Sequence, residues 1–124
     1  MAARLFAALS VGIAAFQVAL AAGAPWGHLA MGGAFPGRFP PAMRVAAAAQ
    51  ALVLVLLGAV VMARAGLVLP HWHAASRRAM PWVVAFTVVG VVLNAVTPSA
   101  PERALWLPVT LVLAVCALVV ARAR

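Results

Sequence analysis

The chain has a single acidic side chain, Glu102, among nine arginines and three histidines. Glu102 follows Ser99 by three residues, with a proline between them, and this spacing predicts a helix start in which the serine caps the first turn. A capping carboxylate can still accept hydrogen bonds from an arginine, so the pair Glu102 and Arg103 is also a candidate contact at a pocket mouth. We therefore expect Glu102 to be paired, with Arg38 or Arg44 as candidate partners.

The histidines are the other side chains that could move protons. His28 and Glu102 form the one acid/base pair that could be built on a single face, and they define an enzymatic alternative. His71 and His73 have the spacing of a metal-chelating pair. No carboxylate or thiol is expected on the same face of the protein to complete a metal site. The sequence has no Ser/His/Asp set, CxxC motif or phosphate-binding loop. It therefore favours a non-catalytic protein and predicts no catalytic residue, no metal and no cofactor.

Three amide side chains interrupt long apolar runs at a similar depth: Gln17, Gln50 and Asn94. Burying an unpaired amide in hydrocarbon is costly, so each is expected to face the interior of a helix bundle. Each could act alone as an interhelical hydrogen-bonding group. Together with Glu102 and Arg103 they support the hypothesis of a polar pocket.

The elements that must position these residues are membrane helices. The chain is 68% hydrophobic and only 8% charged, with a mean hydropathy of +1.15, which is typical of an integral membrane protein. A cleaved signal peptide is the weaker alternative for the first apolar run, because Pro25 would follow the scissile bond. We predict one all-α domain over residues 1–124, a four-helix transmembrane bundle with spans at 5–22, 45–63, 82–97 and 104–121. Tryptophans stand at the ends of these runs, as an aromatic belt predicts: Trp26, Trp72, Trp82 and Trp106.

The arginines predict the orientation of the spans. With four spans, the N-terminus, the second connection and the C-terminus share one side, and the other two connections share the opposite side. The positive-inside rule places the arginine-rich side in the cytoplasm, so both termini are expected there, in the inner (plasma) membrane. Six arginines belong to that side (Arg4, Arg64, Arg77, Arg78, Arg122 and Arg124), and three to the extracytoplasmic side (Arg38, Arg44 and Arg103).

The expected partners follow from the same distribution. The arginines lie at the ends of apolar runs rather than on one face, so nucleic acid is not expected and the lipid bilayer is. Pairs of small residues four apart, such as Ala8 with Gly12 and Ala47 with Ala51, favour close helix packing. This packing could be within the bundle, against a second copy of the chain or against another membrane protein.

The segment GAPWGHLAMGGAFPGRFPPAMR, residues 23–44, separates the first two spans. Connections longer than about 12 to 15 residues are uncommon in compact folds and are usually functional or disordered. Its aromatic and aliphatic side chains make it too apolar for a solvated linker. We predict a glycine-hinged lid over the extracytoplasmic mouth of the bundle, with Pro40 and Pro41 starting the second span and Arg44 as an anchor.

Two recurring segments resemble a family of small bacterial membrane proteins with four predicted helices, a family without an established activity. The first runs from Gly23 to Gly27 and continues through Gly32, Gly33, Pro41 and Arg44; the second comprises Leu93, Asn94, Ser99, Glu102, Arg103, Trp106 and Pro108. The resemblance covers nearly the whole chain. It implies a four-helix architecture and points to these recurring residues, but it implies no reaction.

The function predicted from these observations is binding of a small molecule, lipid or partner at an extracytoplasmic pocket. A small transporter or channel subunit is the first alternative, and it would need a polar path through the cytoplasmic half as well. A membrane-embedded enzyme using His28 and Glu102 is the second. The candidate ligand-binding residues are Trp26, His28, Arg38, Arg44, Glu102, Arg103, Gln17, Gln50 and Asn94.

Overall fold

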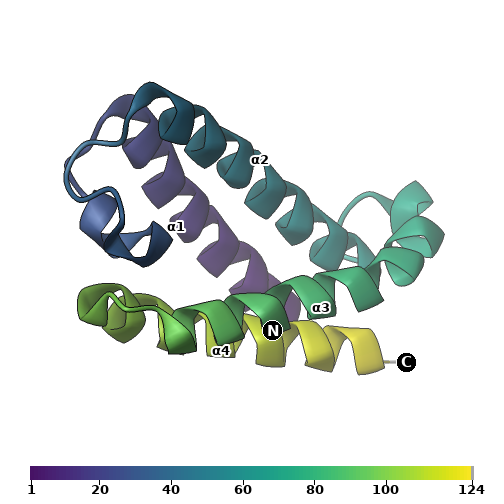
Figure 1. Ribbon diagram of the computed structural model, residues 1–124. Helices are drawn as coiled ribbons and strands as arrows, with labels where there is room; N and C mark the ends of the chain where they lie inside the picture. Colours follow the sequence, from purple (N-terminus) through teal and green to yellow (C-terminus); the bar gives the residue numbers. More distant parts are fainter. Residues whose placement is uncertain (124) are drawn as a thin grey trace.

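The computed structural model describes residues 1–123, and the regular secondary structure in them is helical. Four long helices form the molecule (Figure 1). Their bounds are Ala2–Ala22 (α1), Pro41–Arg64 (α2), His73–Val96 (α3) and Ala100–Arg122 (α4). By length and composition, all four could cross a membrane. The predicted all-α, four-helix transmembrane class is therefore confirmed, while Arg124 of the orientation count lies outside the described residues.

Local sequence explains several helix termini. α1 ends at Gly23, whose φ of 103° is the left-handed conformation that glycine adopts without steric cost. α2 begins at Pro41, where a missing N–H removes no intrahelical hydrogen bond. α4 begins after Ser99, the predicted N-cap, whose side chain accepts from the main-chain N–H of Glu102.

α3 is longer than the sequence predicts. It begins at His73 rather than at residue 82, and Pro81 lies inside it. Proline removes one main-chain donor, yet membrane helices tolerate it where side chains or neighbouring helices satisfy the freed groups. The added turns carry the exposed Arg77 and Arg78, so α3 continues beyond its apolar run into a polar segment.

The helices form two antiparallel hairpins, α1 with α2 and α3 with α4 (Figure 1). The hairpins pack together at the end that holds Met1, Ala123 and residues 65–72, here called the terminal end. They diverge toward the end that holds residues 23–40 and 97–99, here called the connection end. A continuous apolar core closes the terminal end with side chains from all four helices: Ala3, Phe6, Val61, Met80, Val83, Leu113, Cys116, Ala117 and Val120.

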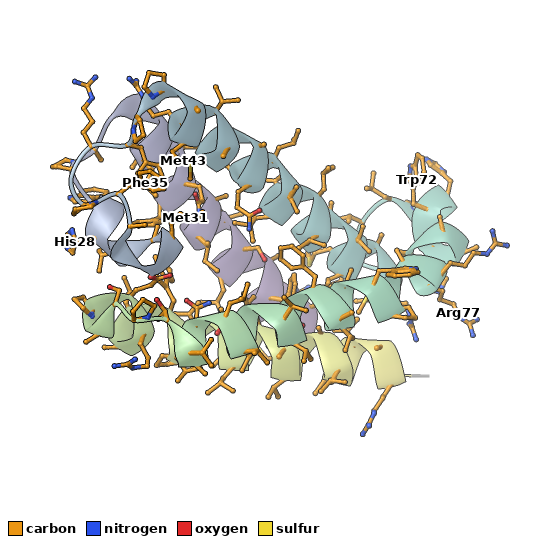
Figure 2. All side chains as sticks on the ribbon, viewed as in Figure 1. His28, Met31, Phe35, Met43, Trp72 and Arg77 are labelled. Atoms are coloured by element: carbon orange, nitrogen blue, oxygen red, sulfur yellow. The ribbon has the colours of Figure 1, made fainter. Side chains whose placement is uncertain are left out.

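Residues 23–40, here called the first connection, fold back between the two hairpins at the connection end (Figure 1). Two short 3-10 helices give the segment shape, Gly27–Leu29 (η1) and Met31–Gly33 (η2). A second apolar cluster fixes it to α1 and α2; Figure 2 labels two side chains packed against this cluster, Phe35 of the connection and Met43 of α2. Its buried members are Leu20, Phe39 and Ala47. The first connection is thus a packed part of the molecule.

Candidate functional site

The turn between α3 and α4, residues 97–99, contacts the one acidic side chain, that of Glu102 in the first turn of α4. Glu102 is only 9% exposed, and its Oε2 accepts a 2.9 Å hydrogen bond from the Thr97 hydroxyl. Ser99 caps α4 as predicted, accepting from the Glu102 N–H over 3.3 Å. The carboxylate does not complete the reciprocal half of a capping box, because the Ser99 N–H donates to the Thr97 Oγ1 instead. Thr97 therefore links both groups, and the sequence analysis did not select it as a site residue.

Glu102 was expected to pair with an arginine. Among residues 1–123, its side-chain partner is the hydroxyl of Thr97 instead. Arg103 Nη1 donates to the carbonyl of Thr97 over 2.8 Å, and Arg44 Nε donates to the carbonyl of Ala21 over 2.7 Å. A carboxylate has about four acceptor positions, so one hydroxyl uses only part of its capacity. Glu102 thus has acceptor capacity beyond its intramolecular contact.

The first connection contacts this turn through its main chain. The Ser99 Oγ donates to the carbonyl of His28 over 2.9 Å, and Trp106 Nε1 donates to the carbonyl of Leu29 over 2.8 Å. An added Cβ on Gly32 would meet Pro98 at 3.4 Å and one on Gly33 would meet Ser99 at 3.4 Å, which is van der Waals contact, and both glycines have positive φ. Side chains of the turn and of α4 therefore bind the backbone of the first connection.

A cluster of aromatic side chains joins the first connection, α1 and α4. Phe16 of α1 stacks on Trp26 at a centroid distance of 6.2 Å and meets Trp106 edge-on at 4.8 Å. Trp26 was a predicted site residue, whereas Phe16 was missed; its place one position before Gln17 was the available signal. Aromatic pairs in these geometries contribute stabilisation beyond that from the apolar area they bury.

His28 reaches the turn through its carbonyl and not through its imidazole. The side chain is exposed and points away from the bundle in Figure 2. The hydrogen bonds of the described residues therefore give no direct link between the imidazole and Glu102. The enzymatic alternative gains no support from this geometry.

The remaining candidates fall outside the turn. Arg38 and Arg44 lie at the C-terminal end of α1, near Gly23 and Ala21 respectively. The amides Gln17, Gln50 and Asn94 are all half-buried.

Among the described residues, the amide of Asn94 forms its hydrogen bond within its own helix and not with another helix. Its Nδ2 donates to the carbonyl of Gly90 in its own helix over 2.7 Å. Gln17, Gln50 and Asn94 line neither the groove beside the start of α2 nor the one between α1 and α2 around Ser10 and Gly58. A shared amide pocket therefore stays a prediction.

One groove of about 350 Å³ runs beside the start of α2. Its walls are Ala21, Pro41, Arg44, Val45 and Ala48. Apart from the Arg44 guanidinium, these side chains are apolar.

Within residues 1–123, no three side chains of His, Cys, Asp or Glu lie close enough to hold a metal ion. Compared with protein-family models, with curated proteins and with solved structures, the chain matched none of them. The resemblance to small four-helix membrane proteins therefore rests on the quoted residues alone.

Proposed function

We propose that this protein is a non-catalytic integral membrane protein that binds a ligand at the extracytoplasmic face of the inner (plasma) membrane. Its termini lie in the cytoplasm, and the first connection and the α3–α4 turn form the recognition element. The ligand is a small molecule, a lipid or a partner that offers a hydrogen-bond donor or a positive charge to Glu102.

One observation carries this proposal: a buried carboxylate, held by one neutral hydroxyl, lies beside a segment docked by side-chain to main-chain hydrogen bonds. Burying a charge is costly unless it is paired and hydrogen-bonded. Thr97 supplies one such bond, and an incoming donor could supply others. The hydroxyl and indole groups that bind the first connection are neutral, and each such bond contributes about 0.5 to 1.5 kcal/mol. The contact with Ser99 and Trp106 can therefore open at modest cost while the apolar cluster keeps the connection on α1 and α2.

The packing of the terminal end supports binding rather than transport. All four helices contribute to the apolar core there, and a polar path would have to cross it. Thr87 is a buried polar residue of α3, and its hydroxyl donates to the carbonyl of Val84 within its own helix. Ser10 is also buried, and its hydroxyl has no partner among the described residues. These two groups do not form a continuous polar route.

Cysteine labelling in intact cells tests the orientation and the closed core together. In a Cys116→Ala background, Ala34→Cys should react with a membrane-impermeant maleimide added outside, because Ala34 is exposed in the first connection. Ala75→Cys, exposed near the start of α3, should react only after the cells are opened. Leu113→Cys, in the apolar core, should stay unlabelled from either side.

Each position has its own contradicting result. Labelling of residues 34 and 75 from the same side would contradict the four-span topology. Rapid labelling of residue 113 would indicate a water-filled path and would favour the transporter or channel alternative. A denatured sample, in which all three cysteines react, provides the control for reactivity.

A further inference from the structure

Two arginines bring positive charge to the C-terminal end of α1. Arg44 is half-buried, and its Nε is fixed by the 2.7 Å hydrogen bond to Ala21. Arg38 is exposed, and its guanidinium lies over Gly23, where an added Cβ would meet Nε at 2.8 Å and Nη2 at 3.0 Å. A helix C-terminus carries only about half a negative charge, so it offsets a minor part of the two positive charges.

The chain offers no carboxylate to complete this neutralisation. Glu102 is its only acidic side chain, and it lies on α4, bound to Thr97. Both guanidinium groups lie at the C-terminal end of α1, that of Arg44 at Ala21 and that of Arg38 at Gly23, and the described hydrogen bonds give neither of them an acidic partner. Such a pair favours an anion from outside the chain. Arginine suits phosphate in particular, because its planar group can donate two parallel hydrogen bonds. With the Nε of Arg44 engaged, its terminal nitrogens remain as donors for such a ligand.

The groove beside Arg44 indicates what carries that phosphate. It has a volume of about 350 Å³, and its other walls are Ala21, Pro41, Val45 and Ala48. Val45 and Ala48 are exposed on the surface of α2, in the apolar stretch of a candidate membrane span. An open apolar groove with one guanidinium in its wall is complementary to an amphiphile that has a hydrocarbon chain and an anionic head.

We propose that this groove binds an anionic phospholipid, with the headgroup phosphate between Arg38 and Arg44 and an acyl chain along Val45 and Ala48. The charge complementarity selects an anionic over a zwitterionic headgroup, and the apolar walls select a lipid over free phosphate. Arg38 belongs to the first connection and Arg44 to α2, so the bound phosphate also ties the connection to the bundle. The inference requires membrane insertion but is independent of the ligand proposed at Glu102.

Lipid binding to the full-length protein in detergent tests the assignment by native mass spectrometry. After delipidation, the protein is titrated with phosphatidylglycerol, with phosphatidylcholine of the same acyl chains and with inorganic phosphate. Phosphatidylglycerol should bind about tenfold more tightly than phosphatidylcholine, given the attraction of two arginines for an anionic lipid. The double variant R38Q/R44Q should lose this preference.

Matched variants separate the site from general charge and from misfolding. R77Q/R78Q removes the same charge from exposed arginines at the terminal end, where Figure 2 places Arg77, and should keep the preference. Ala48→Phe should weaken lipid binding by filling the groove while both arginines stay intact.

Ala46→Phe is the control for Ala48→Phe, because Ala46 is exposed on α2 but does not line the groove. Equal affinities of the wild type for the two lipids would overturn the proposal. So would a preference that survives in R38Q/R44Q, or inorganic phosphate that binds as tightly as phosphatidylglycerol.

Discussion

Gly27→Ala should detach the first connection from the α3–α4 turn. Gly27 is buried, and its N–H donates to the carbonyl of Gly37 over 2.8 Å, which closes the connection on itself. A methyl group at this position would overlap the main-chain oxygens of Phe35 and Gly37. Backbone atoms cannot rotate aside as a flexible side chain can, so the closed form should lose about 3 kcal/mol, the upper part of the range for overpacking.

Hydrogen exchange measured by mass spectrometry would detect this loss. A change of about 3 kcal/mol corresponds to roughly a hundredfold faster exchange of the amides of the first connection, if exchange proceeds by local opening. Gly12→Ala is the matched control, because Gly12 lies in α1 with no atom within 4 Å of an added Cβ. It should leave exchange unchanged or slower, since alanine favours helix. Wild-type exchange in Gly27→Ala would contradict the docked arrangement.

Ala117→Phe should destabilise the whole bundle. Ala117 has no exposed surface and lies in the core where the four helices meet. In lipid, helix association depends on packing more than on hydrophobicity, so a larger apolar side chain gains nothing by burial. It forces the helices apart at a cost of about 1 to 3 kcal/mol or more.

Unfolding titrations with sodium dodecyl sulfate measure this cost. Leu118→Phe is the control, because Leu118 is its neighbour in α4 but is exposed on the surface of the bundle. It should shift the transition by less than about 0.5 kcal/mol, the usual range for surface substitutions. Equal destabilisation by the two variants would contradict the close packing of the terminal end.

The sequence predicted the features that depend on local composition. The four apolar runs predicted the four helices, and Ser99 predicted the start of α4, because capping needs only residues near in the chain. α3 begins at His73, before the start of the predicted third span at residue 82. Proline is a reliable helix breaker in water, but Pro81 is accommodated within a helix that could span a membrane.

The partners within the site depended on tertiary structure. Glu102 was expected to bind an arginine, yet the end of α3 presents the hydroxyl of Thr97, and Arg103 turns to the carbonyl of that residue. Arg38 and Arg44 are near Glu102 in predicted topology, but the fold takes them to the end of α1. Long flexible side chains can reach many acceptors, so their choice is not encoded by spacing.

The central claim is that Glu102 contacts a ligand at the connection end of the bundle. Native mass spectrometry of the full-length protein, extracted from its membranes in mild detergent, tests it most directly. The wild type should retain a bound molecule, and Glu102→Gln should reduce its occupancy about tenfold, because a hydrogen bond to a charged group is worth about 1.5 to 3 kcal/mol. Glutamine keeps the shape and can still accept from Thr97, so the bundle should stay folded.

Thr110→Val supplies the control on the same helix. The Thr110 hydroxyl donates only to carbonyls of α4 itself, those of Trp106 and Leu107, so its loss should leave the occupancy at the wild-type level. Phospholipid that responds to R38Q/R44Q and not to Glu102→Gln belongs to the groove beside α2 and is counted separately. We expect a bound mass that Thr110→Val keeps and Glu102→Gln loses. Equal occupancy in the wild type and Glu102→Gln, or no bound mass in the wild type, would contradict it.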